Sequence, residues 1–250
     1  MSAYNQTLWV VWGNHILAIL ALVFFFEWWM IPALFILGHL FGIINELSIH
    51  RYFSHGSYKV NARWKEHVLK AMAFLVGQGA IMSWTTVHRH HHAYEDQPGD
   101  PHSPYYHPLW KIYVGLFPTE YKKNMVVDFL RHRDKNYFIF ENKYYWLMWT
   151  ALWIVSYLIS PYLFFAIVGG SAVWYAYTAL IVNIISHMGT FGYKTYPDTV
   201  SSNSKLANWI AGPLAGLHNN HHKNSRSYTY NLDGDTNMDF VGWIIEKIKS

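Results

Sequence analysis

Histidines at a repeated spacing are the residues of this 250-residue chain most suited to chemistry. In HRHHH, the residues His88, His91 and His92 are related as i, i+3 and i+4, so an α-helix would place them on one face. His90 would point roughly 200° away from His88. Neutral imidazole is a common metal ligand, and clustered rings have little packing value, so a metal site is predicted. The same spacing recurs in HNNHH, as His218, His221 and His222.

Two further pairs of polar residues stand at the ends of apolar segments. His50 and His55 in HRYFSH lie about 140° apart on a regular helix. They can reach one site only if the helix ends or unwinds there, unless the two rings serve different ions. Asn183 and His187 in NIISH form an i, i+4 pair on one face. A polar pair at the end of a membrane span is costly without partners, which makes this pair a candidate for function.

Without His90, these four motifs hold nine histidines, which exceed the four ligands that one zinc ion takes, so a dinuclear site is expected. Imidazole suits zinc, copper, iron and nickel, and the ligands alone therefore do not name the metal. A redox function would exclude zinc as the working ion. The chain has no cysteine, which excludes thiolate ligands, disulfides and thiol catalysis.

The positions of the cations indicate a membrane topology for this chain, of which 52% is hydrophobic. All nineteen Lys and Arg lie within residues 51–143 or 194–249, and none lies in 1–50 or 144–193. Each cation-free block is long enough for two crossings at roughly 20 residues each. The positive-inside rule places both basic blocks, both termini and the histidines in the cytoplasm. Cations beside apolar spans are explained by topology and anionic headgroups, so nucleic-acid binding is not expected.

These segments predict an all-α membrane protein in a single domain. Four transmembrane helices in two hairpins are expected to form a stem, at about residues 8–49 and 144–190. A cytoplasmic helical cap, at about 50–143 and 191–250, is expected to hold the dinuclear site. We interpret the first apolar run as a retained span. The stretches 67–84 and 205–217 are interpreted as interfacial or re-entrant, because an odd number of crossings would separate the histidine clusters.

The spacings of the histidines, in this order around two hairpins, resemble the membrane-bound fatty-acyl desaturases of the stearoyl-CoA desaturase type. The likeness covers most of the chain, through IHRYFSHGSYK, SWTTVHRHHHAYEDQPGDPHSP, LIVNIISHMG and LAGLHNNHHKN. It implies a four-helix membrane stem, a cytoplasmic cap and a site with two iron ions. It also implies that dioxygen is the co-substrate, and that two hydrogens are removed from a saturated acyl chain to leave a cis double bond.

The resemblance assigns roles to individual positions. Asn183 would hold a metal-bound water, while Gln78 and Trp84 would help to bend the substrate tunnel. The deep end of the tunnel would fall near Gly38, whose missing side chain would admit a longer acyl chain unless His39 or a bulky neighbour fills the space. The implied metal ligands are His50, His55, His88, His91, His92, His187, His218, His221 and His222.

Several positions depart from the pattern of that family. Thr86 and Val87 stand where the animal acyl-CoA enzymes carry an Arg-Asp pair, which puts CoA recognition by the same contacts in doubt. Ala179 and Leu180 replace a tunnel-lining Thr-Trp pair, so a reshaped cavity is expected.

Two carboxylates are candidates for orienting a ligand imidazole. Glu46 lies one helical turn before His50, where small or apolar residues are usual in the family. It either orients that ring or pairs elsewhere at the membrane interface. Asp239 is a second candidate acceptor for a ligand histidine.

An external electron donor is expected, either a cytochrome b5 or a ferredoxin that docks on the cap. Five cations of the predicted cap either attract such an acidic partner or face lipid headgroups or solvent. They are Lys122, Lys123, Arg131, Arg133 and Lys135.

The expected function is an iron-dependent desaturase that acts near carbon nine of an acyl chain carried on CoA, an acyl carrier protein or a lipid. A membrane hydroxylase or ketolase with the same kind of di-iron centre is the first alternative, and it differs in whether the carbon radical loses a second hydrogen or captures oxygen. A membrane metal carrier is the second alternative. Transporter sites tend to lie near the bilayer midplane, whereas these ligands lie at the ends of spans.

Overall fold

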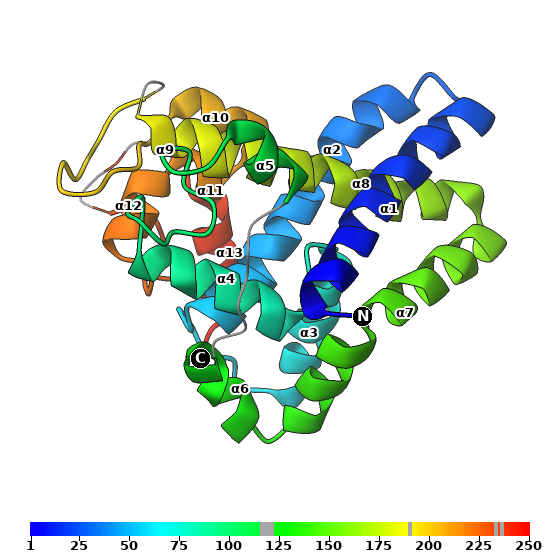
Figure 1. The fold of residues 1–250 in the computed structure, drawn as a ribbon, viewed down its shortest axis with the longest axis horizontal. Helices are drawn as coiled ribbons and strands as arrows, with labels where there is room; N and C mark the ends of the chain where they lie inside the picture. Colours follow the sequence, from blue (N-terminus) through cyan, green and yellow to red (C-terminus); the bar gives the residue numbers. More distant parts are fainter. Residues whose placement is uncertain (116–122, 190–191, 233–234, 236–237) are drawn as a thin grey trace.

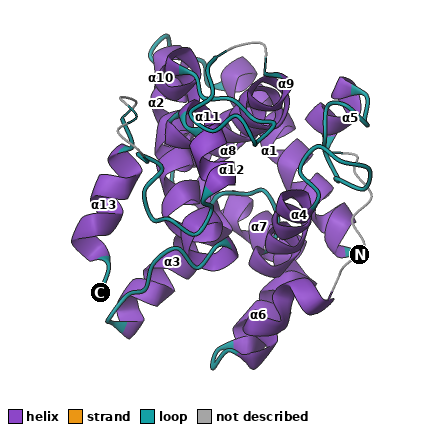
Figure 2. Ribbon diagram, turned by 90° about the vertical axis from the view of Figure 1, so that its left-hand side faces the viewer, coloured by secondary structure: helices purple, strands orange, loops and turns teal. Residues whose placement is uncertain are grey.

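The computed structural model of the chain describes residues 1–115, 123–189, 192–232, 235 and 238–250. Every regular element of these residues is a helix, as the turned view shows (Figure 2). Outside the helices, the described backbone forms two isolated β-bridges, from Asn203 to Tyr193 and to Leu217. The all-α expectation is therefore confirmed.

Four long helices form two hairpins. The first joins α1 (Ala3–Phe24) to α2 (Met30–Asn45), and the second joins α7 (Lys135–Ile159) to α8 (Pro161–Tyr177). The α7–α8 turn is a sharp helix start, because the Ser160 hydroxyl caps α8 and a proline occupies its first position. In Figure 1 the four helices run together on the right of the molecule, with α2 and α8 crossing towards the shorter helices on the left.

Three helices are long and apolar enough to cross a membrane: Ala3–Phe24, Met30–Ser54 and Pro161–Met188. The expected fourth span belongs to α7, which is not one of them. α7 is kinked at Tyr144, where φ is −119°. Its remaining part, 144–159, is shorter than the roughly 20 residues that a hydrocarbon core requires, and it is rich in tryptophan and tyrosine.

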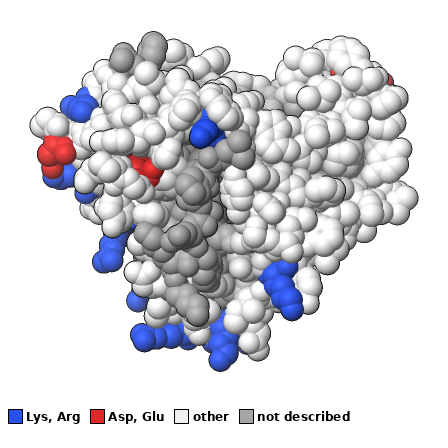
Figure 3. Space-filling view, viewed as in Figure 1, with Lys and Arg blue, Asp and Glu red and all other residues white. Residues whose placement is uncertain are grey.

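The surface agrees with a division into a lipid-facing part and a polar part. In Figure 3 the Lys and Arg side chains lie on the left and lower parts of this face, and none is seen over the outer ends of the long helices at the upper right. Apolar side chains are exposed there instead, among them Val23 and Phe24 of α1 and Leu158 and Ile159 of α7. Such an apolar surface is suited to contact with acyl chains of a bilayer.

A buried polar network ties the long helices together inside the apolar part. The Asn14 amide donates to Ser171 Oγ at 2.9 Å, and Trp153 Nε1 donates to Asn14 Oδ1 at 2.8 Å. Ser171 in turn donates to the carbonyl oxygen of Val76 at 2.9 Å. The network therefore connects α1, α7 and α8 with the segment before α4. It also satisfies polar groups that would be costly to leave unpaired in this apolar part of the molecule.

Shorter helices build the remainder of the described chain. The apolar stretch 67–84 is not one helix, because Gly77 and Gly79 adopt positive φ and separate α3 from α4. The shorter helices are α3 (Arg63–Leu75), α4 (Ile81–Ala93), α5 (Leu109–Val114), η2 (Lys123–Val126), α6 (Val127–Arg131), α9 (Ser186–Met188), α10 (Lys205–Ala211), α11 (Pro213–Gly216), α12 (His218–Lys223) and α13 (Phe240–Ile248).

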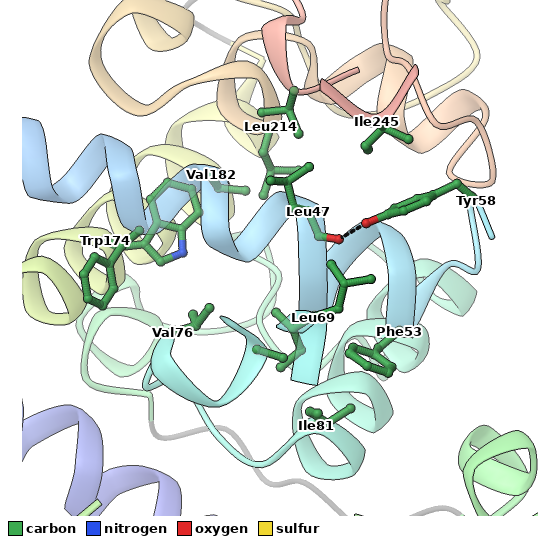
Figure 4. Packing of buried hydrophobic residues seen from close by; sticks show 14 of the residues in the cluster. Leu47, Phe53, Tyr58, Leu69, Val76, Ile81, Trp174, Val182, Leu214 and Ile245 are labelled. Carbon is green, nitrogen blue, oxygen red and sulfur yellow. Dashed lines mark hydrogen bonds between the residues drawn. The ribbon is translucent and has the colours of Figure 1, made fainter. Parts of the chain in front are cut away.

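The main hydrophobic core lies where the long helices meet the short ones (Figure 4). Trp174 of α8 and Val182 pack with Leu214 of α11 and Ile245 of α13 in one cluster of buried residues. Tyr58 belongs to the same cluster, and its hydroxyl donates to a backbone carbonyl of the segment that follows α2. This core holds the helices that carry the histidines at fixed relative positions.

Candidate metal centre

The structure brings the nine predicted histidine ligands together in two groups. Within each group, one ligand atom per residue lies within 4.8 Å of the others. His90 belongs to neither group, and its ring instead contacts Tyr94. The five-histidine group consists of His50, His55, His88, His92 and His221, and the four-histidine group of His91, His187, His218 and His222.

Each histidine triplet contributes to both groups. On α4, His88 and His92 join the five-histidine group and His91 joins the four-histidine group. On α12 the division is reversed, since only His221 joins the five-histidine group. Two short helices thus hold the groups side by side, as a dinuclear site requires.

A local change of helix type brings His50 and His55 together. After Asn45, α2 continues as a π-helix, η1 (Glu46–Ser54), and the backbone N–H of His55 donates to the carbonyl oxygen of His50 at 3.1 Å. In a π-helix the hydrogen bond joins residues five apart, so these two side chains lie about one turn above each other. The helix widens from Glu46 and ends at Ser54, so that His55 is its C-cap residue. The expected end of the helix at this motif is therefore seen, together with a change of helix type that the sequence analysis did not expect. α8 changes in the same way into η3 (Thr178–Ile185), just before His187.

The inner atoms of the histidines fit a metal ion. His55 Nε2 and His88 Nε2 lie 2.7 Å apart, and the corresponding distance between His187 and His218 is 2.8 Å. A neutral imidazole has one N–H, so converging ring nitrogens cannot all satisfy one another. The fully buried Nε2 of His50 has no hydrogen-bond partner among the described residues. A cation shared by these lone pairs would satisfy them all.

In four of these histidines, a carboxylate contacts Nδ1, the ring nitrogen on the side away from the other histidines. The shortest contact joins His187 Nδ1 to Asp96 Oδ2 at 2.7 Å. Such partners fix the tautomer and orientation of a metal-binding ring, and they leave Nε2 for the metal. The other contacts are His50 to Glu46 at 2.8 Å, His91 to Asp100 at 2.9 Å and His222 to Glu95 at 3.2 Å.

Three of the four carboxylates were missed by the sequence analysis. Glu95, Asp96 and Asp100 follow directly after the HRHHH motif, in EDQPGD. The sequence signal for these carboxylates was their position close after the histidine motif. A chain that leaves a helix there can fold back and place carboxylates against the Nδ1 atoms of the histidines. Asp100 additionally accepts from the backbone N–H groups of Asp96 and His102, which fixes the turn.

Burial favours the neutral form of seven of the nine imidazoles. Desolvation, aided by the neighbouring rings, lowers the pKa of six of them well below its ordinary value: His55, His88, His91, His92, His218 and His221. The same cause lowers the pKa of His222. Neutral imidazole is the form that binds a metal, so the site is ready to do so at neutral pH.

Asp239 does not contact a histidine, and this expectation is corrected. Its carboxylate receives hydrogen bonds from Arg51 Nη1 at 2.9 Å and Nη2 at 3.0 Å, and Arg51 Nε donates to Glu46 at 2.9 Å. A guanidinium group offers two parallel N–H donors that match both oxygens of a carboxylate, whereas an imidazole offers one. Arg51 is therefore the better partner for Asp239. Asp239 thus reaches His50 through Arg51 and Glu46.

An apolar cavity of about 280 Å³ leads to the metal centre. His88, His91 and His218 line it, and so does Asn183, the residue expected to hold a metal-bound water. The remaining walls come largely from α1, α4 and η3. His102 also lines the cavity, and its ring lies 4.2 Å from that of His91.

The predicted tunnel residues divide into those that line this cavity and one that does not. Gln78 and Trp84 line it, and Trp84 stacks on the ring of His88 at 4.6 Å. Gln78 Nε2 donates to Thr178 Oγ1 across the cavity at 3.2 Å. Gly38 is not one of the lining residues. A Cβ atom there would meet Val173 Cγ1 at 2.5 Å, so Gly38 serves the packing of α2 against α8. A neighbouring side chain thus fills the space, which is the alternative that the sequence analysis left open.

The positions that depart from the expected family pattern lie at this cavity as well. Thr86, Val87 and Ala179 line it, whereas Leu180 is turned outward and is 45% exposed. Thr178, the residue before Ala179, lines the cavity as well.

Comparison with known proteins decides the family. The sequence profile described as fatty acid desaturase matches residues 26–234, a range that includes all nine histidines of the two groups. The chain belongs to the fatty acid desaturase family. The resemblance seen in the histidine motifs is thereby confirmed.

Several relatives with desaturase or acetylenase names are similar to this chain. The desaturase-family chain is 30% identical over 203 residues to the hex-5-enoyl acyl-carrier-protein acetylenase of Moorena producens (strain JHB), covering 70% of the chain and 60% of the relative. It is 29% identical over 234 residues to the Delta-9 desaturase-like 2 protein of Arabidopsis thaliana, covering 88% of the chain and 73% of the relative. The chloroplastic palmitoyl-monogalactosyldiacylglycerol delta-7 desaturase of Arabidopsis thaliana is 29% identical over 236 residues, with 90% and 61% covered. The chain thus spans less than two thirds of two of these relatives.

The cations expected to face an electron donor lie in and around α6. Arg131, Arg133 and Lys135 are exposed on this desaturase-family chain, and Arg133 pairs with Glu66 of α3. Lys122 and the side chain of Lys123 lie outside the described residues.

Proposed function

We propose that the chain is a di-iron, dioxygen-dependent desaturase that introduces a cis double bond, near carbon nine, into a saturated fatty acyl chain. The observation that carries this proposal is the convergence of nine buried histidines, in two adjacent groups, at one end of an apolar cavity. The ligands proposed for the two irons are the members of the five-histidine and four-histidine groups, with Asn183 acting through a water.

Iron bound by these histidines would supply the activation of dioxygen that the removal of two unactivated hydrogens requires. The residues of the chain perform the other tasks. The apolar cavity holds the acyl chain away from water, and Trp84 and the Gln78–Thr178 hydrogen bond fix its course beside His88. Four carboxylates hold the imidazole rings in place by accepting from Nδ1.

The membrane topology proposed with this function has four spans. α7 would provide the fourth span and form a hairpin with α8, the span that follows it. Residues 50–143 and 191–250 would form a cap on the cytoplasmic side together with both termini, in agreement with the positions of all nineteen cations. In this topology the metal centre lies at the cytoplasmic ends of the spans.

The substrate carrier is proposed to be a thioester or a lipid. Thr86 and Val87 line the cavity in place of the charged pair that the animal acyl-CoA enzymes carry, which favours an acyl carrier protein or a lipid over CoA. The names of the relatives include an acyl-carrier-protein acetylenase and a palmitoyl-lipid desaturase. The proposed electron donor is a cytochrome b5 or a ferredoxin attracted by Arg131, Arg133 and Lys135.

Expression of the chain in a host that lacks its own desaturase tests the proposal. The expected result is a new monounsaturated acyl chain in the lipids of the host, with the double bond near carbon nine and cis, located by mass spectrometry after derivatisation. The His91→Ala variant is the control that should make no such product. A hydroxylated or ketone product would instead establish the alternative oxidation on the same centre, and activity that does not require iron would overturn the proposal.

A further inference from the structure

A fully buried arginine lies next to the five-histidine group. Arg51 is 0% exposed and follows directly on His50 in η1. Its guanidinium is hydrogen-bonded to Glu46 and Asp239, and Nη1 also donates to the carbonyl oxygen of Tyr228 at 2.7 Å. Buried charges are retained only where partners compensate the desolvation, and Arg51 has two carboxylates and a carbonyl.

The outer nitrogen of His50 faces two oxygens. Nδ1 lies 2.8 Å from Glu46 Oε1 and 3.0 Å from the hydroxyl oxygen of Tyr230. Because Nε2 of His50 is the atom turned towards the other histidines, Nδ1 carries the proton and donates to this pair of oxygens. Tyr230 is 0% exposed, so its hydroxyl is held beside this nitrogen away from solvent.

Tyr230 is held by the same arginine and by the C-terminal segment. The Arg51 guanidinium lies over the Tyr230 ring, 3.7 Å from its centroid. The backbone N–H of Tyr230 donates to Asp239 Oδ2 at 2.7 Å, and its carbonyl accepts from Asn220, the residue before ligand His221. Asp239 also accepts from the backbone N–H of Gly242 and thereby caps α13.

We propose that Tyr230 is a positioning residue for His50, and that Arg51 and Asp239 connect this ligand to helix α13. The inference rests on the proposed function, since it concerns the iron held by the five-histidine group. A tyrosine from a loop near the C-terminus thereby completes the surroundings of a ligand that lies on the second span, 180 residues earlier. The effect of Tyr230 is confined to one of the two irons, because no residue of the four-histidine group contacts it among the described contacts.

The test compares Tyr230→Phe with a matched control, Tyr58→Phe. Both residues are buried tyrosines, but the Tyr58 hydroxyl donates to the backbone oxygen of Leu47 in η1 and touches no ligand. Each purified variant is loaded with ⁵⁷Fe, and its iron content and Mössbauer spectrum are measured before and after exposure to a chelator. In Tyr230→Phe we expect one of two iron signals to shift and that iron to bind about 10–100-fold more weakly. Tyr58→Phe should keep the wild-type spectrum.

A second variant tests the connection to α13. Asp239→Asn removes the charge that holds Arg51 and should shift the same iron signal as Tyr230→Phe. If both variants keep the wild-type spectrum and iron affinity, the inference is overturned while the proposed function stands. If they change both iron signals equally, the role of Tyr230 is a general structural one and the inference is overturned as well. A wild-type chain that binds no iron would overturn the proposed function itself.

Discussion

The backbone N–H of His55 donates to the carbonyl oxygen of His50, and this single π-helical turn lets both rings face the same group of histidines. On a regular α-helix the two residues would diverge by about 140°. The turn is supported by Ser54, whose hydroxyl reaches the carbonyl oxygen of Ile49 at 2.7 Å and Thr85 of α4 at 3.0 Å. A change of helix type, rather than a loop, therefore assembles the first motif with the second.

Neighbouring histidines on α4 should differ sharply in importance. We expect His90→Ala to retain both metals and full activity, because His90 lies outside both groups. His91→Ala should lose activity and metal from the four-histidine group, with an effect larger than the 10–100-fold loss caused by removing an outer partner. Metal content by elemental analysis and product formation are the measurements. A His90→Ala protein without metal would contradict this assignment of faces.

Filling the cavity should slow turnover without disturbing the metals. Ala179 lines the cavity, and the larger ring of Ala179→Phe would overpack it. Overpacking costs about 1–3 kcal/mol, which corresponds to a fall of about 5- to 150-fold in product formation. Leu180→Phe is the matched control, since Leu180 is turned outward. Equal activity of the two variants, at equal metal content, would show that the acyl chain does not occupy this cavity.

Removing Asn14 should destabilise the long helices. In Asn14→Ala the indole N–H of Trp153 and the hydroxyl of Ser171 each lose a partner in an apolar environment. The expected loss in the free energy of unfolding is about 1–2 kcal/mol. It can be measured as a lower midpoint of thermal unfolding in detergent. Ile16→Ala on the exposed face of the same helix should have a much smaller effect, and a reversed order would argue against the network.

Glu141 should make the stability of the fold depend on pH. Burial raises the pKa of Glu141 to about 8 from an ordinary value of 4.5, although its carboxyl accepts from the backbone N–H of Ile81. Between these values the folded chain holds a proton that the unfolded chain lacks, so the free energy of unfolding falls as the pH rises through that window. The full contribution is present below about pH 4.5, falls through the window above it and has been lost once the pH exceeds about 8.

The Glu141→Gln variant tests this dependence. The side chain of this variant stays neutral at every pH. We therefore expect its midpoint of thermal unfolding to change less between pH 6 and 9 than that of the wild type, measured in steps of roughly one pH unit. Glu27→Gln, at an exposed carboxylate of the α1–α2 turn, should leave the wild-type slope unchanged. An identical slope in Glu141→Gln and wild type would show that Glu141 is charged in the fold.

Local spacing was enough to predict much of the site. The i, i+3, i+4 pattern predicted which histidines of α4 and α12 converge, and it left out His90, because the geometry of a helix follows from its backbone. The family motifs also identified Gln78 and Trp84 at the cavity. The sequence left open whether a neighbour fills the space beside Gly38, since that depends on which helix packs there, and Val173 of α8 fills it.

The sequence by itself determined that the chain is helical, that its cations avoid the apolar segments and that nine histidines are spaced to bind metal. Only the tertiary structure decided how those histidines divide between two groups, and which carboxylates orient them. Asp239 illustrates the reason: it was expected to contact a histidine, but the packing of α13 places it against Arg51. Contacts between residues far apart in the chain depend on how helices pack, and side-chain spacing within one helix carries no information about that packing.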